Sequence, residues 1–317
     1  MVKAVFLDYG SVSFDGDLND AALTAALPAL QIYQNTRDEE ADARLTDCVV
    51  ALSNSIQYGR ERLLRHPKLR LIALTATGTN SVDLEAAREL GVAVCNIRDY
   101  CTASIVQHVF AGLLALTHHI REYDSAVKAG RWERIHQHVA LAPIRELAGR
   151  TLGIVGFGML GQAVARAADA FGMHVLVAGR PGHAAAGRIA LTELLPQVDV
   201  LSLHCPITPE TKYLINRTSL NLLPSDAILI NTARGGLVDA QALAEALRGR
   251  TLGGAFIDVL AEEPPTSDSP LLNVDIPNLI LSPHMGWAAR EARQRAVDEL
   301  AKNVTDFLRG GTRNRIV

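Results

Sequence analysis

The chain has 317 residues, more than one hydrophobic core usually holds together, so its length predicts two domains. Hydrophobic residues make up 48% of the chain and charged residues 21%, a globular composition that excludes a disordered protein. The net charge is −3 and no basic run occurs, which argues against nucleic acid as the main partner. The sequence contains no run of about 20 apolar residues, so it predicts no membrane span and no membrane partner.

The cysteines are too few and too scattered to form a disulfide framework or a metal site. Cys48, Cys95, Cys101 and Cys205 make no CxxC pair and have no metal-ligand spacing. We therefore expect reduced thiols, a cytoplasmic protein and no metal. Cys205 is interpreted as a small packing residue rather than as a thiol nucleophile.

Strand-like and helix-like segments alternate along the whole chain. Most strand-like segments are continuous runs of Val, Ile and Leu, typical of strands buried on both faces of a parallel sheet. Such alternation predicts an α/β fold, here with two Rossmann-like, doubly wound parallel sheets. The predicted strands are Ala4–Asp8, Leu71–Thr75, Val92–Asn96, Leu152–Val155, Val175–Ala178, Val200–His204, Ala227–Asn231, Gly254–Asp258 and Leu279–Ser282.

A glycine-rich motif lies midway along the chain, between the strand-like Leu152–Val155 and the helix-like Gln162–Phe171. In this position the first glycine permits a tight turn, the second lets the backbone approach a pyrophosphate, and the third lets helix and strand pack closely. The helix N-terminus then offers free N–H groups to the phosphates. A plain strand-to-helix turn is the alternative. The three glycines are Gly156, Gly158 and Gly161.

The midway position of this motif predicts a separate α/β unit before it. The apolar stretch Ile105–Thr117 predicts a buried helix, within a helical stretch from about Ser104 to Trp132 that could bridge the two units. We expect a substrate-binding, flavodoxin-like domain at 1–99 plus 286–317 and a dinucleotide-binding Rossmann domain at 100–285. A cleft between them is expected to bring cofactor and substrate together.

The end of the strand after the motif carries information on the cofactor. A dinucleotide fold usually has an acidic residue about 20 residues past the glycines, where it binds the ribose hydroxyls. Here Gly179 stands at that place and Arg180 follows it. A guanidinium attracts a 2′-phosphate that a carboxylate would repel, which favours NADP(H). NAD(H) stays possible if Arg180 is only a solvated loop residue.

Three polar residues stand just past apolar strands in the C-terminal half: Arg234, Glu263 and His284. Ligands of open α/β sheets bind beyond the carboxyl ends of the strands, so the three side chains could face one site. Taken singly, each is more often a solvated charge or a satisfied polar group. Their joint position behind a dinucleotide motif makes them candidates for catalysis.

At this point the chain resembles the D-isomer-specific 2-hydroxyacid dehydrogenase family. The glycine motif matches, and Thr75–Asp83 and Trp287–Arg293 are most similar to glycerate dehydrogenases (hydroxypyruvate reductases). One departure concerns the catalytic acid, because Ala261-Glu262-Glu263-Pro264 replaces the common Glu-Pro-Glu-Pro and leaves two adjacent acids. The further matching segments are His204–Thr211, Asn231–Asp239, Asp258–Pro264 and Ser282–Trp287.

The resemblance implies hydride transfer between NAD(P)H and a small 2-oxo acid, converting hydroxypyruvate or glyoxylate to D-glycerate or glycolate. It implies that Arg234 binds the substrate carboxylate, that His284 is the general acid or base, and that Glu263 favours the protonated imidazole. The backbone N–H groups of Ala76, Thr77 and Gly78 are implied to help hold the carboxylate.

The resemblance also implies cofactor contacts. For two of them an alternative stays open, because Asp258 could be a turn-capping acid instead of a carboxamide ligand, and Val106 could only pack in the core. Trp287 could line the pocket or fill an interface. The implied cofactor-binding residues are Gly156, Gly158, Met159, Leu160, Gly161, Gly179, Arg180, Cys205, Pro206, Thr211, Thr232, Ala233, Asp258, His284, Gly286 and Val106.

Other functions are weighed against this one. A dinucleotide-sensing, corepressor-like binding protein would share the fold but lack turnover. A family member could also act on another 2-hydroxy acid, or oxidise formate or phosphite, although a His284–Glu263 pair favours oxo-acid reduction. The resemblance finally implies a homodimer through the Ser104–Trp132 region, whose apolar residues an internal core would explain equally well.

Overall fold

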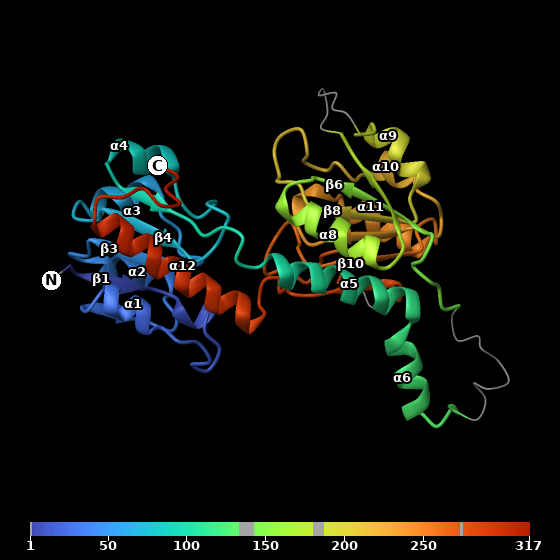
Figure 1. Ribbon diagram of the computed structural model, residues 1–317, viewed down its shortest axis with the longest axis horizontal. Coiled ribbons are helices and arrows are strands. Elements are labelled where there is room, and N and C mark those ends of the chain that lie inside the picture. The colour runs from blue at the N-terminus through green and yellow to red at the C-terminus, as the bar shows by residue number, and fades with distance from the viewer. Residues whose placement is uncertain (1, 133–142, 180–186, 273–274) are drawn as a thin grey trace. The chain divides into compact units, whose positions relative to one another are not determined.

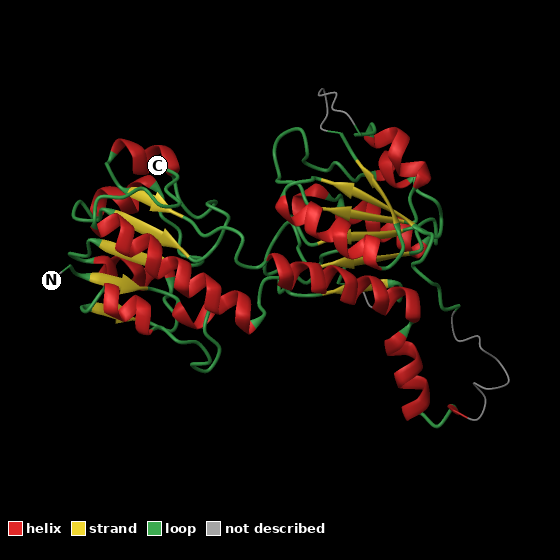
Figure 2. Ribbon diagram, in the orientation of Figure 1, coloured by secondary structure: helices red, strands yellow, loops and turns green. Residues whose placement is uncertain are grey.

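The structure is a computed structural model that describes residues 2–132, 143–179, 187–272 and 275–317 (Figure 1). The chain divides into two compact units, Met1–Cys101 with Trp287–Val317, and Thr102–Gly286. Each unit is a parallel sheet with helices on both faces, as Figure 2 shows. The predicted α/β class with two doubly wound sheets is therefore confirmed.

The unit Met1–Cys101 with Trp287–Val317 has a five-stranded sheet in the order β2-β1-β3-β4-β5, the flavodoxin-like arrangement. Helices α1 and α12 cover one face, and α2, α3 and α4 cover the other. The strands are β1 (Ala4–Phe6), β2 (Leu30–Ile32), β3 (Val50–Ser53), β4 (Leu71–Leu74) and β5 (Ala93–Cys95); the helices are α1 (Ala21–Ala26), α2 (Asp38–Leu45), α3 (Arg60–Arg65), α4 (Leu84–Glu89) and α12 (Arg290–Leu308).

The unit Thr102–Gly286 has a six-stranded sheet in the order β11-β10-β9-β8-β6-β7. Its topology switches at β6, which pairs with β7 on one side and β8 on the other. Helices α5 and α8 pack on one face, and α9, α10 and α11 on the other. The strands are β6 (Thr151–Val155), β7 (His174–Val177), β8 (Val200–Leu203), β9 (Ile228–Asn231), β10 (Gly254–Ile257) and β11 (Leu279–Leu281); the helices are α5 (Thr102–His118), α8 (Met159–Ala170), α9 (Leu191–Leu194), α10 (Arg217–Leu220) and α11 (Ala240–Arg248).

Every predicted strand has a counterpart, but β2 and β3 are missing from the prediction. The short edge strand β2 is only half-buried, so it carries no continuous apolar run. In contrast, β3 is fully buried and follows Val49, and this apolar run was a signal that sequence reasoning overlooked.

The single long helix predicted from about Ser104 to Trp132 is wrong. The chain breaks at His119, whose φ is +48°, and continues as α6 (Ile120–Lys128) at 56° to α5. The left-handed backbone at His119 cannot continue a right-handed helix. No single described helix is long and apolar enough to cross a membrane, and only the bent pair α5–α6 passes that test by length and composition.

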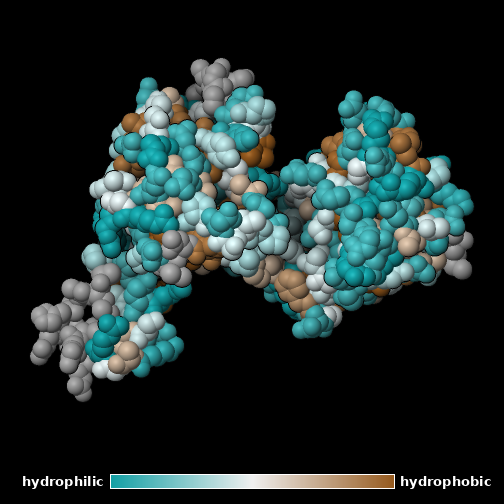
Figure 3. Space-filling model, turned by 180° about the vertical axis from the view of Figure 1, so that it is seen from behind, coloured by the Kyte–Doolittle hydropathy of each residue, from teal (hydrophilic) through white to brown (hydrophobic). Residues whose placement is uncertain are grey.

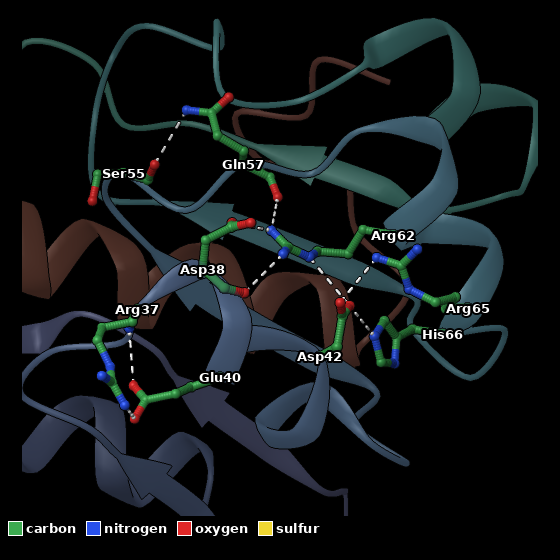
Figure 4. A network of polar contacts seen from close by, with 9 residues as sticks. All are labelled: Arg37, Asp38, Glu40, Asp42, Ser55, Gln57, Arg62, Arg65 and His66. Atoms are coloured by element: carbon green, nitrogen blue, oxygen red, sulfur yellow. Dashed lines mark hydrogen bonds and ion pairs between the residues drawn. The ribbon is translucent and has the colours of Figure 1, made fainter.

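A buried arginine ties α2, α3 and the loop after β3 together (Figure 4). The Arg62 guanidinium donates to Asp38 Oδ1 at 2.9 Å, to Asp42 Oδ1 at 3.2 Å and to the Gln57 carbonyl oxygen. His66 Nε2 lies 2.9 Å from the same Asp42 oxygen. Burial penalises the Asp42 carboxylate, yet the hydrogen bonds and charges around it outweigh burial and lower its pKa. This network explains the presence of a buried charge in the core of that unit.

Candidate active site

Arg234, Glu263 and His284 follow three neighbouring strands of the Thr102–Gly286 unit. The strands β9, β10 and β11 run parallel, and Ile257 pairs with Asn231 on one side and Leu281 on the other. Their carboxyl ends therefore share one edge of the sheet, the edge at which open α/β sheets bind ligands.

A glycine lets two of the loops at this edge touch. A Cβ on Gly235 would lie 1.9 Å from the carbonyl carbon of Leu260, so no side chain fits there. The loop that begins with Arg234 is thus pressed against the loop after β10. Leu260 N–H in turn donates to Glu263 Oε1 at 2.8 Å, which fixes the side chain of that acid.

His284 and Glu263 form a hydrogen-bonded pair. His284 Nδ1 lies 2.7 Å from Glu263 Oε2, and the two side chains are 42% and 37% exposed. Burial opposes ionisation of Glu263, but the hydrogen bonds from His284 and from Leu260 N–H lower its pKa. The neighbouring Glu262 is exposed and forms no hydrogen bond within the described residues, so the structure pairs His284 with Glu263.

The buried Asp258 organises the turn that carries His284. Its Oδ1 accepts from Met285 N–H at 2.8 Å and from Ser282 Oγ at 2.6 Å, and its Oδ2 accepts from Gly286 N–H at 2.8 Å. Burial penalises the carboxylate, yet these donors and His108 outweigh it and lower the pKa of Asp258. These contacts describe Asp258 as a turn-capping acid. A contact between Asp258 and the carboxamide of the cofactor stays a prediction.

Arg234 is half-buried and has no carboxylate partner among the residues the structure describes. Its Nη1 donates to the Ala233 carbonyl oxygen at 2.7 Å. The fully buried Asn231 shapes this loop, because its Nδ2 donates to the Arg234 carbonyl at 2.9 Å and its Oδ1 accepts from Ala233 N–H at 3.1 Å. A cation held at a sheet edge without a counter-ion suits an anionic ligand.

The glycine turn between β6 and α8 fits a dinucleotide. Gly156 has φ +93°, and a Cβ there would lie 2.6 Å from Cys205 N. A Cβ on Gly161 would lie 2.2 Å from the Gly156 carbonyl oxygen, whereas one on Gly158 would meet nothing within 4 Å. The first and third glycines are thus required for close packing, and the second faces open space. The N-terminus of α8 follows directly, at Met159.

Two buried polar atoms without a partner lie on neighbouring strand ends. Leu203 pairs with Asn231, so the next residues, His204 and Thr232, stand side by side at the carboxyl edge. His204 Nδ1 and Thr232 Oγ1 are both buried and have no hydrogen-bond partner in the described part of the chain. Burial lowers the pKa of His204 to about 4, so its imidazole is neutral. Such atoms suit a ligand with hydrogen-bonding groups, which supports the fit of a dinucleotide.

His204 was not among the predicted residues, although its position directly before Cys205 in a matching segment could have drawn attention to it. Burial raises the pKa of the Cys205 thiol, which keeps the thiol protonated and agrees with a packing role. In the same loop, Thr211 Oγ1 donates to the Pro206 carbonyl at 2.8 Å and accepts from Thr208 N–H at 2.7 Å.

Of the remaining cofactor-binding candidates of this unit, the structure describes Met159, Leu160, Gly179 and Val106. Met159 is 53% exposed at the start of α8, next to the half-buried Leu160. Gly179 N–H donates to the Ile189 carbonyl at 2.8 Å, and Arg180 lies outside the described residues. Val106 packs against the core beneath α5, as its alternative interpretation holds.

The predicted carboxylate-binding loop belongs to the other unit. The N–H groups of Ala76, Thr77 and Gly78 have no acceptor among the described residues, which leaves three adjacent donors for an anion. The loop is held by its other groups, since Thr77 Oγ1 donates to the Ile97 carbonyl at 2.8 Å. Trp287 packs against a small cluster of the same unit around Ile97.

A cavity of about 430 Å³ opens beside the His284–Glu263 pair. Polar groups come from the ends of β10 and β11, and the rest of its wall is apolar. The mixture of an apolar wall and a few polar groups is typical of small-molecule sites. Its lining includes Asp258, Leu260, Glu263, Leu281, Ser282 and His284.

Comparisons with known proteins identify the family of this chain. A model of the D-isomer specific 2-hydroxyacid dehydrogenase, NAD binding domain, matches residues 110–286. A glycerate dehydrogenase from Methylorubrum extorquens is 42% identical over 284 residues, or 89% of this chain and 90% of that protein. A hydroxypyruvate reductase from Blautia hydrogenotrophica is 35% identical over 322 residues, or 99% of each chain.

A solved structure has the same fold. The acyclic imino acid reductase Bsp5, in complex with NADPH and D-Arg, aligns with a TM-score of 0.87 at 26% identity and covers 100% of both chains. The family model spans more than half of this chain, and the relatives match nearly all of it. The chain therefore belongs to the D-isomer specific 2-hydroxyacid dehydrogenase family.

Proposed function

We propose that this protein reduces hydroxypyruvate and glyoxylate to D-glycerate and glycolate with a nicotinamide dinucleotide. The observation that carries the proposal is the His284–Glu263 pair, 2.7 Å apart, on the sheet edge that also presents Arg234. The names of the similar glycerate dehydrogenase and hydroxypyruvate reductase point to the same substrates. Since the matching family model and the similar proteins are named as dehydrogenases and reductases, the alternative of a non-enzymatic dinucleotide sensor is not retained.

Substrate binding falls to Arg234 in this proposal. Its guanidinium offers a fork of donors that matches a carboxylate, and its remaining donors polarise the 2-oxo group. The N–H groups of Ala76, Thr77 and Gly78, which have no acceptor among the described residues, are proposed as further neutral donors for a carboxylate. The bound nicotinamide supplies the hydride.

The proton is the second requirement, because hydride addition to a ketone leaves negative charge on oxygen. Glu263 engages Nδ1 of His284, so Nε2 is the nitrogen that gives the proton. Glu263 is ionised at neutral pH, and its negative charge stabilises the imidazolium form. In the oxidation direction the same nitrogen takes the proton back from the hydroxyl group.

A panel of 2-oxo acids assayed with NADPH and NADH tests this function. Hydroxypyruvate and glyoxylate should give the highest kcat/KM, followed by other 2-oxo acids such as pyruvate and 2-oxoisocaproate. The highest kcat/KM with one of these other acids would overturn the substrate assignment. No turnover of any 2-oxo acid would overturn the proposal as a whole.

We further propose that NADP(H) is the preferred cofactor. No acid stands at Gly179, and a second arginine supports the preference that Arg180 suggests. The Arg188 guanidinium carbon lies 4.8 Å from the centre of the Phe157 ring, in the glycine turn. The next residue, Ile189, pairs with the end of β7 through Gly179 N–H. The positive charge of Arg188 beside the glycine turn thus supports the proposed binding of an adenosine 2′-phosphate.

Gly179→Asp should reduce the ratio of kcat/KM with NADPH to kcat/KM with NADH by at least about tenfold, because a carboxylate repels the 2′-phosphate and accepts from ribose hydroxyls. Arg188→Ala should lower the same ratio through weaker NADPH use. Arg166→Ala, which removes an exposed arginine from α8, is the control and should leave the ratio unchanged. An unchanged ratio in both test variants contradicts the preference.

We also propose a homodimer that uses α6. This helix projects from the sheet of its own unit (Figure 1), and Ala126 is its one fully buried residue within the described range. Ile120 and Val127, seven residues apart on one helical face, are 58% and 36% exposed. Elsewhere the face seen in Figure 3 is mainly hydrophilic, with small hydrophobic patches. Sedimentation velocity should give twice the chain mass of 34.1 kDa, and Ile120→Lys should shift it to the monomer.

A further inference from the structure

The N-terminal turns of α5 reach the turn that carries His284. Ser104 and His108 lie one helical turn apart on the same face of α5. Ser104 Oγ donates to the Gly286 carbonyl oxygen at 2.6 Å. His108 Nε2 lies 3.1 Å from Asp258 Oδ1 and 3.0 Å from Ser282 Oγ. Neither α5 residue was a candidate from the sequence.

The hydrogen atoms in this cluster can be assigned from its partners. Ser282 Oγ lies 2.6 Å from Asp258 Oδ1, and the ionised carboxylate can only accept, so the hydroxyl donates to it. The hydroxyl oxygen can then only accept from His108. Nε2 of His108 therefore carries a hydrogen and shares it between Asp258 and Ser282. The ring is also held edge-on against Phe256, with centroids 4.9 Å apart.

Asp258, which is hydrogen-bonded to His108, also holds the backbone beside His284. Its two oxygens accept from the N–H groups of Met285 and Gly286, both at 2.8 Å. His284 itself has φ +54°, a left-handed conformation that is uncommon for residues other than glycine. Moreover, a Cβ on Gly286 would lie 3.4 Å from the His108 ring, so ring and turn are in close contact.

We propose that His108 is a positioning residue for the acid–base histidine: it orients the Asp258 carboxylate, which holds the turn 284–286 and thereby the imidazole of His284. The proposal rests on the function proposed above. His108 acts through the backbone rather than on the substrate, so its loss should reduce kcat more than it raises KM. Substrate binding, which is assigned to Arg234, should change little.

The test compares His108→Leu with His108→Gln, because the Gln amide can replace the Nε2–H donor at a similar reach and Leu cannot. Gln107→Leu, on the exposed side of the same helix, is the control. Ser282→Ala removes only the hydroxyl and takes the place of His108→Leu if that variant fails to fold. Two quantities are measured for each protein: kcat and KM for hydroxypyruvate, and hydrogen exchange of the Met285 and Gly286 amides.

His108→Leu should lower kcat about tenfold, leave KM nearly unchanged and accelerate exchange of both amides, with His108→Gln restoring most of kcat and of the protection. Unchanged exchange in His108→Leu overturns the proposal, and so does faster exchange with wild-type kcat. A general loss of stability would instead speed exchange across α5 and the sheet as well. If the wild-type protein reduces no 2-oxo acid, the proposed function fails, and the exchange data alone decide whether His108 holds the turn.

Discussion

Replacing His284 by Asn should lower the kcat of hydroxypyruvate reduction by about 10²–10⁴-fold, the range that a positioned acid–base group contributes. The Asn side chain has no acidic proton to give to the developing alkoxide. Asn is preferred to Ala here because it tolerates the φ of +54° at this position, so the turn survives the substitution. The dissociation constant of NADPH, measured by fluorescence titration, should stay near the wild-type value.

His174→Asn is the matched control, because His174 is exposed at the start of β7 and forms no hydrogen bond with a candidate residue within the described ranges. It should leave both kcat and NADPH binding unchanged. A His284→Asn enzyme with wild-type kcat would remove His284 from its role as the proton donor.

The pH dependence of the reductase activity is a second test of the His284–Glu263 pair. Glu263 is ionised at neutral pH because its hydrogen bonds from His284 and Leu260 overcome burial and lower its pKa. Reduction needs the protonated imidazole, and Glu263→Gln removes the charge that stabilises it. The alkaline loss of reductase activity should therefore begin at a lower pH in this variant. If the alkaline loss of activity occurs at the same pH in Glu263→Gln as in the wild type, Glu263 only orients the imidazole ring of His284.

Replacing Arg234 by Lys should raise the KM for hydroxypyruvate by about 10²-fold and also lower kcat. A lysine keeps the positive charge but loses the planar fork that binds a carboxylate through two hydrogen bonds. The half-buried Arg234 has no carboxylate partner among the described residues, so the substrate is the anion expected to occupy it. Steady-state kinetics over a range of hydroxypyruvate concentrations separates the two effects.

Arg217→Lys provides the comparison for this substitution. The Arg217 side chain is 66% exposed and forms an ion pair with Glu245. These two residues lie on α10 and α11, not at the carboxyl ends of the strands. It should leave KM and kcat unchanged. If Arg234→Lys behaves in the same way, carboxylate recognition by Arg234 is contradicted.

Most of the fold could be read from local patterns, because strands of a parallel sheet are buried on both faces and so become continuous apolar runs. The buried strands β4, β8 and β9 all carry such runs. The pattern failed where this condition does not hold, as at the half-buried edge strand β2. It also could not find the break at His119, because the sequence there stays compatible with a helix while the backbone turns left-handed.

In the candidate site, the sequence placed Arg234 and His284 after strands, but it assigned the acid to Glu263 rather than Glu262 only by its register before Pro264. The two acids are adjacent, and only the path of the loop decides which carboxylate meets the imidazole. Leu260 N–H and His284 each donate to Glu263, while Glu262 is exposed and forms no hydrogen bond within the described residues.

What the sequence by itself determined is the α/β class, the glycine turn and the family, since each depends on residue types within a few positions of one another. The tertiary structure alone decided the partners of Asp258. His108 lies 150 residues before Asp258 in the chain, and only the packing of α5 on the sheet brings them to 3.1 Å. Hydrogen bonds act over a few ångströms in space, so no pattern along the chain records which distant side chains will meet.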